Sequence, residues 1–230
     1  MARARQRSSG GDASPDRDGP PVSTRPKNPV RPPGPLSIGP QDIRIVDGAE
    51  LFRITFASSP FALAWGRLRS WGPVARCRWD PHPEPPGDHP GEGVLYTAGD
   101  LMTCVAEVFA DTRVIDTRCD TPVLQIWQAT RAMRLLDLGG QWALRNGASA
   151  ALDSAPRSTC RAWARAVREQ APDLDGLAVR STMTGRGMTV LFAPAANSIP
   201  LRPRDSVPLT DSTIYALLAH LAPRIGYTVI

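Results

Sequence analysis

The stretch Gly93–Phe109, GVLYTAGDLMTCVAEVF, places the strongest constraint on what this chain can fold into. An apolar run, Val94–Ala98, predicts a short buried strand, and the pair Gly99-Asp100 predicts a tight turn after it. A helix is expected to follow at once. Two polar side chains, Tyr96 on the strand and Glu107 on the helix, are unusual for simple core elements. A strand, a turn and a helix would bring both toward one rim of a sheet.

The helix of this unit has recognisable ends and faces. Asp100 is a good N-cap because a carboxylate accepts hydrogen bonds from the free backbone N–H groups of a first turn. Glu107 lies on the flank of the apolar stripe, at the boundary between core and solvent or cleft. The stripe itself follows the helical spacing i, i+3, i+4, i+7 and comprises Leu101, Cys104, Val105 and Val108.

A second strand is predicted at residues 50–56, where apolar and polar side chains alternate. Phe52, Ile54 and Phe56 would share one face, so Arg53 would point away from them. The alternation leaves open whether Arg53 points into solvent or into a cleft.

The remaining pattern mixes short strands and a few helices without regular βαβ alternation, which predicts an α+β fold. We expect a compact mixed or antiparallel sheet core with flanking helices. Residues 60–92 are irregular, with a possible short helix at Phe61–Gly66 and a Pro-rich surface loop at Pro81–Gly91 that could form a rim. Further strands are expected at Val123–Trp127, Met133–Leu136, Gly176–Arg180 and Thr189–Phe192, and further helices at Pro156–Gln170 and Thr213–Leu221.

Two parts are predicted along the chain: a disordered Pro/Arg-rich tail at residues 1–40 and one domain at residues 41–230. The tail offers little apolar surface to offset the cost of ordering. It carries seven basic and three acidic side chains, so it holds most of the net charge of +5. The domain is therefore nearly neutral, and we expect no specific nucleic-acid partner.

Several classes of protein are disfavoured. No uninterrupted apolar run reaches the length of about 18 residues that a membrane helix needs, and no signal-peptide pattern begins the chain, so we expect a cytoplasmic protein without membrane contact. The four cysteines form no CxxC pair, and His82 and His89 lie in a loop without metal-ligand spacing, so no metal site is expected. The turn Gly185–Gly187 lacks the lysine of a P-loop.

Five short motifs together resemble the RES domain family. They are LFR with Arg53, the pair Arg78-Trp79, VLYTA with Tyr96, AEVF with Glu107, and the strand end Arg180-Ser181. Their order and context match over about residues 51–192. Cys77 and Asp80 depart from the Gly and Asn that commonly flank the Arg-Trp pair, and Gly187-Met188 replaces an Asn often present before the last strand.

The resemblance implies a fold like that of ADP-ribosyltransferase toxins and NAD+ as the substrate, cleaved at the nicotinamide–ribose bond by phosphorolysis or hydrolysis. NAD+ would be a substrate rather than a cofactor, with inorganic phosphate as a possible co-substrate. It implies catalytic roles for Glu107, Arg53 and Ser181 and substrate-binding roles for Tyr96 and Arg78. Many members are toxins held inactive by a cognate antitoxin, which would be the protein partner here.

Two other functions remain open from the sequence. The same site could transfer ADP-ribose to a macromolecule, or the domain could be a non-catalytic binding or interaction module. Each residue also has a structural alternative: Glu107 could be a helix-surface carboxylate paired with an arginine, Tyr96 a core tyrosine, and Ser181 a turn or cap residue.

Overall fold

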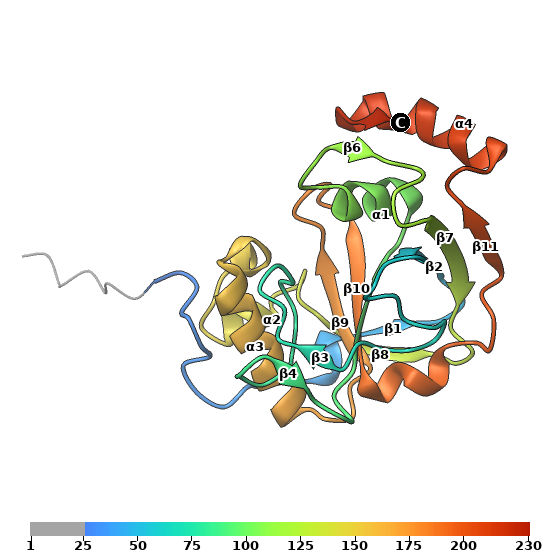
Figure 1. Cartoon of the computed structure of the whole chain (residues 1–230). Coiled ribbons are helices and arrows are strands. Elements are labelled where there is room, and N and C mark those ends of the chain that lie inside the picture. Colours follow the sequence, from blue (N-terminus) through green and yellow to red (C-terminus); the bar gives the residue numbers. More distant parts are fainter. Residues whose placement is uncertain (1–25) are drawn as a thin grey trace, which may run out of the picture.

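The computed structural model describes residues 26–230, which form an eight-stranded mixed sheet with helices packed around it (Figure 1). The strand order is β1-β8-β9-β10-β5-β2-β7-β11, and within it the β8–β9 pair is parallel while the other neighbours are antiparallel. The α+β prediction is thus confirmed. The strands of this sheet are β1 (Ile43–Val46), β2 (Glu50–Phe56), β5 (Val94–Ala98), β7 (Pro122–Gln128), β8 (Met133–Asp137), β9 (Gly176–Arg180), β10 (Gly187–Phe192) and β11 (Asp205–Pro208).

The predicted strands correspond to the central part of this sheet. In β5, β9 and β10 nearly every side chain is buried, because these strands are covered on both faces and therefore have continuous apolar sequences. The short strands at the periphery lack such a run and were not predicted. They are β3 (Trp71–Gly72), β4 (Gly87–Asp88), β6 (Val114–Ile115) and β12 (Thr228–Val229), which form two small two-stranded sheets.

Helices cover the sheet in two groups, visible in Figure 1 as α1 and α4 at the top of the view and α2 and α3 at its left. The first group packs around Cys104, Val105 and Leu218, and the second around Trp142 and Trp163. The helices are α1 (Leu101–Val108), α2 (Trp142–Arg145), α3 (Arg157–Gln170) and α4 (Ser212–Leu221), with 3-10 turns η1 (Pro40–Asp42), η2 (Ala150–Ser154), η3 (Ala193–Ser198) and η4 (Ala222–Ile225).

The short helix considered at Phe61–Gly66 does not form, and this segment consists of turns and irregular backbone. Four consecutive side chains from Phe61 to Ala64 are exposed, so the segment has no apolar face buried against the domain. Without such packing a helix of this length does not offset the cost of its nucleation.

Part of the predicted disordered tail is in fact packed against the domain. Residues 26–40 run along the second core group: Trp163 Nε1 donates to the Pro29 carbonyl at 2.9 Å, and Asn146 bonds the backbone of Ser37 at 2.7 and 3.1 Å. Leu36 and Ile38 pack against the core there. The sequence did not indicate this packing, because single side chains of the domain hold the segment and the segment itself has no periodic apolar pattern. The rest of the predicted tail, residues 1–25, lies outside the described residues.

The sheet divides between β2 and β5, and this division positions the candidate site. Along β2 and β7 seven residue pairs are in register, whereas β2 and β5 pair only at Phe52 and Ala98. Beyond that pair the two strands separate. Residues of both strands beyond that pair therefore border an open space.

Candidate active site

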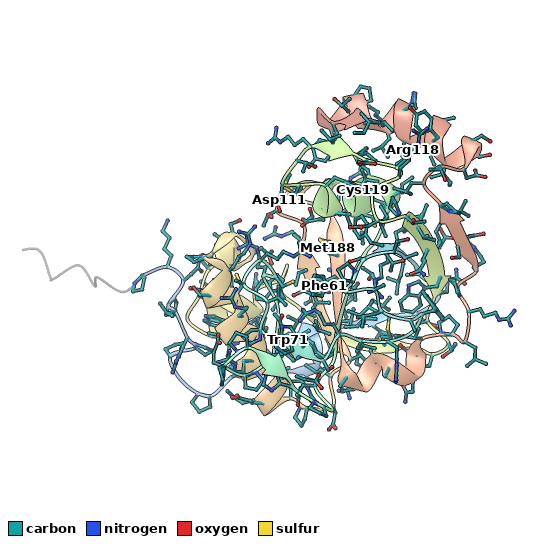
Figure 2. The ribbon with its side chains drawn as sticks, viewed as in Figure 1. Phe61, Trp71, Asp111, Arg118, Cys119 and Met188 are labelled. Carbon is teal, nitrogen blue, oxygen red and sulfur yellow. The ribbon has the colours of Figure 1, made fainter. Side chains whose placement is uncertain are left out.

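A cleft of about 350 Å³ occupies the space between β2 and β5, with α1 along one side and the loop at Ser59–Leu63 at its border. Ligand-binding clefts commonly have volumes of about 300–1,000 Å³. Two of the residues that line this cleft, Phe61 and Met188, lie near the middle of the view in Figure 2, below α1. Three of the side chains predicted from the sequence to form the site also line it: Arg53, Tyr96 and Glu107.

Glu107 is positioned by the unit predicted from the sequence. Asp100 caps α1 by accepting from the backbone N–H of Thr103 at 2.9 Å, which sets the start of the helix at the end of β5. Glu107, two turns further along, is partly buried and extends into the cleft. Its Oε1 accepts a hydrogen bond of 2.5 Å from the hydroxyl of Ser181, a short distance typical of an O–H donor and a carboxylate.

Ser181 is buried in the turn between β9 and β10, and the turn fixes the direction of its hydroxyl. Its oxygen accepts from the backbone N–H groups of Met183 and Thr184 at 3.1 and 3.0 Å. Two N–H donors occupy the acceptor positions of the oxygen, so its own proton points to Glu107. Gly185, at φ +72°, provides the left-handed residue that closes the turn.

The same turn is attached to the beginning of α1. The hydroxyls of Thr184 and Thr103 lie 3.0 Å apart, and the N–H of Gly99 donates to the Gly187 carbonyl at 3.2 Å. The helix that carries Glu107 and the turn that carries Ser181 are therefore held together at two points besides the contact between these two residues.

Arg53 extends from β2 into the cleft and is partly buried. Among the described residues it has no ion-pair partner and no side-chain hydrogen bond. Burial lowers the pKa of its guanidinium, although the group remains protonated at neutral pH. A partly buried cation without a protein partner favours an anionic ligand beside it.

Tyr96 lies on β5 and its hydroxyl oxygen accepts from the backbone N–H of Trp79 at 3.2 Å. Burial raises the pKa of this phenol well above its ordinary value, so Tyr96 is neutral and can offer its own O–H and its ring to a ligand. Through this bond, Tyr96 also fixes the segment that contains the Arg78-Trp79 pair.

Arg78, which was predicted to bind substrate, lies outside the cleft. Its guanidinium donates to the Ala155 carbonyl and approaches Cys160 Sγ at 3.8 Å, so it is directed toward the beginning of α3 and does not line the cleft. The structure brings Arg53, Tyr96, Glu107 and Ser181 together and leaves Arg78 outside this group. The neighbouring backbone of Trp79, rather than the Arg78 side chain, contacts the site.

Two arginines that the sequence analysis did not select, Arg69 and Arg76, line the cleft. Both lie in the irregular region 60–92, where no periodicity indicates the direction of a side chain. The rim was expected at Pro81–Gly91 instead, and no residue of that loop lines the cleft. Phe61, also missed, is 87% exposed at the border of the cleft, where an aromatic ring can stack on a planar ligand.

The arrangement has a definite charge pattern. Three arginines line the cleft, and Glu107 is the one carboxylate among its described lining residues. Such a site can bind an anionic ligand through the arginines and stabilise a positive charge that develops next to Glu107.

Within residues 26–230, no helix is long and apolar enough to span a membrane.

Comparisons with known proteins show the family and the fold to which this chain is similar. The family model described as "RES domain" matches residues 50–211, which include all four residues that the structure brings together. A chain in the crystal structure of the M. tuberculosis MbcT–MbcA toxin–antitoxin complex has a similar fold, with a TM-score of 0.50 and 20% sequence identity over 76% of this chain and 92% of that chain. A comparison with curated proteins found no match. Because the family model covers well over half of the sequence, this chain belongs to the RES domain family.

Proposed function

We propose that this protein is an enzyme that cleaves the nicotinamide–ribose bond of NAD+. The observation that carries the proposal is the position of Glu107, which lines the same cleft as Arg53 and Tyr96 and is oriented by Ser181 at 2.5 Å. A carboxylate in a cleft of arginines suits a substrate that is anionic at its pyrophosphate and becomes positively charged at its sugar.

The expected reaction is a substitution at the anomeric carbon of the nicotinamide ribose. The C–N bond breaks, and its electron pair neutralises the pyridinium, which leaves as nicotinamide. The ribose passes through an oxocarbenium-like state, as in glycoside cleavage. An oxygen of phosphate then forms the new C–O bond to give a sugar phosphate, or water attacks and loses a proton to give ADP-ribose.

Each residue has a physical role in this proposal. The Glu107 carboxylate stabilises the developing positive charge and can hold a ribose hydroxyl. The Ser181 hydroxyl positions that carboxylate. Arg53 binds phosphate oxygens, because its planar guanidinium suits a bidentate contact. Tyr96 positions the nicotinamide or its ribose by stacking or by its O–H.

A role as the toxin of a toxin–antitoxin pair is part of the proposal. Its support is membership of the RES family and the likeness of fold to a chain of a toxin–antitoxin complex. An antitoxin protein would then be the partner of this chain.

Nicotinamide release from NAD+ by the purified protein, measured with and without inorganic phosphate, tests the proposal. We expect release by the wild type and a loss of about 100-fold or more in Glu107→Gln, which keeps the shape but removes the charge. Asp111→Asn is the matched control, because Asp111 is an exposed carboxylate near the end of α1, outside the cleft lining. Intact NAD+ after long incubation with protein shown to be free of bound inhibitor would contradict the proposal.

The fate of the sugar separates the alternatives. NAD+ labelled in its ADP-ribose part would give a sugar phosphate by phosphorolysis and free ADP-ribose by hydrolysis. Label on a protein or nucleic acid would instead indicate transfer. Saturable partner binding without loss of NAD+ would indicate an interaction module.

A further inference from the structure

Arg76 differs from Arg69 and Arg78 of the same irregular region because its side chain makes no contact that holds the fold. It lines the cleft, it is exposed, and among the described residues it has no ion-pair partner or side-chain hydrogen bond. Two residues away, Arg78 is bound to the Ala155 carbonyl. The same short segment therefore contains one structural arginine and one free arginine directed to the cleft.

The backbone on both sides of Arg76 is fixed. Arg161, from α3, donates through Nη1 to the carbonyl of Ala75 at 2.8 Å and approaches that of Cys77 at 3.5 Å. Cys77 N–H in turn donates to the Val74 carbonyl at 2.9 Å, which closes a turn around Arg76. A loop held this firmly presents the Arg76 side chain from a defined position, which lowers the entropic cost of binding a ligand.

A buried carboxylate holds a further arginine of the cleft next to this turn. Asp80 bonds Arg69 at 2.8 Å and the N–H of Val74 at 2.8 Å, and its other oxygen contacts His82. Burial alone would raise the pKa of Asp80, but these hydrogen bonds outweigh it and hold the pKa well below the ordinary value. Asp80 is therefore ionised and offsets the charge of Arg69, so Arg53 and Arg76 remain as the uncompensated cations of the cleft.

We propose that Arg76, together with Arg53, binds a phosphate group in this cleft. Arg78, to which the family resemblance gives a substrate-binding role, is directed away from the cleft toward Ala155. The inference rests on the proposed function for the identity of the substrate. The shared ligand chemistry is a set of phosphate oxygens, which arginine contacts through two parallel N–H donors. The group is either the pyrophosphate of the dinucleotide or the free phosphate that attacks the sugar.

Binding of inorganic pyrophosphate to the full chain, measured by calorimetry at fixed ionic strength, tests the inference without requiring catalysis. Arg76→Ala should weaken binding by about tenfold or more, the loss expected for one charged hydrogen-bonding group. Arg76→Lys should give an intermediate affinity because it keeps the charge and loses the bidentate contact. Arg67→Ala is the matched control, since Arg67 is exposed in the same region and does not line the cleft.

Equal weakening by Arg67→Ala and Arg76→Ala would show a general charge effect and overturn the inference, as would the absence of pyrophosphate binding by the wild type. In nicotinamide-release kinetics, an increased KM for NAD+ in Arg76→Ala would identify the dinucleotide pyrophosphate, and an increased KM for phosphate would identify the free anion. Unchanged KM values for both would also overturn it. A wild type that binds pyrophosphate through Arg76 but leaves NAD+ intact would refute the proposed function and retain this inference.

Discussion

The hydroxyl of Ser181 offers the sharpest test of how the site is built. It donates to Glu107 at 2.5 Å and accepts from the N–H groups of Met183 and Thr184. Ser181→Ala removes all three hydrogen bonds while adding no atoms to a buried position. The carboxylate then loses the donor that orients it, and the turn loses the acceptor that closes it.

The magnitude follows from these contacts. A hydrogen bond to a charged group contributes about 1.5–3 kcal/mol, and the two backbone donors, which lie near the surface, recover part of their loss by bonding water. We therefore expect the free energy of unfolding to fall by about 2–3 kcal/mol. For a chain of this length each kcal/mol corresponds to ~2–4 °C, so Tm should fall by about 4–12 °C.

Urea unfolding and thermal melting of the two proteins measure this change directly. Thr182→Ala, at the exposed neighbouring position, should remain within about 0.5 kcal/mol of the wild type. If Ser181→Ala were as stable as the wild type, the turn would not depend on the hydroxyl, and our account of how Glu107 is oriented would be wrong. Nicotinamide release should also fall in folded Ser181→Ala and not in Thr182→Ala.

Two further predictions concern the contacts that hold the arginines of the cleft and the contacts that hold residues 26–40 against the domain. Asp80→Asn should lower the free energy of unfolding by about 3 kcal/mol at neutral pH, because it leaves Arg69 and His82 without their buried partner. The folded-state pKa of Asp80 is depressed, so its contribution to stability is present above the unfolded pKa near 3.8 and is lost as the pH falls below it. Between pH 5 and about 2.5, the free energy of unfolding measured in urea should therefore decline less in the variant than in the wild type. Asn146→Ala removes the bonds to the backbone of Ser37 and should lower stability by about 1–2 kcal/mol and speed proteolysis before residue 40; unchanged proteolysis would mean that the segment is held elsewhere.

Local sequence patterns predicted the structure correctly where the residues that determine it lie in one short segment. The strand at Val94–Ala98, the cap at Asp100 and the apolar face of α3 were all predicted, because burial and capping impose fixed spacings on neighbouring residues. The alternation in β2 likewise separated Arg53 from the Phe52 face. It could not decide between solvent and cleft, because that depends on the separation of β2 from β5.

The structure differs from expectation where contacts between distant segments decide the outcome. Residues 26–40 were predicted as disordered because their composition is polar and Pro-rich, yet Trp163 and Asn146, more than 100 positions later in the chain, bind their backbone. Arg78 was selected for its motif, whereas its side chain donates to Ala155, 77 residues away. Neither partner can be identified from the local sequence.

The sequence by itself determined the fold class and the strand–turn–helix unit that presents Glu107. Tertiary structure alone decided which arginines face the cleft and which hydroxyl orients the carboxylate. The physical reason is that side-chain direction in a regular element follows from its period, whereas in the irregular loop that contains Arg69 and Arg76 it follows from which distant donors and acceptors fix the backbone.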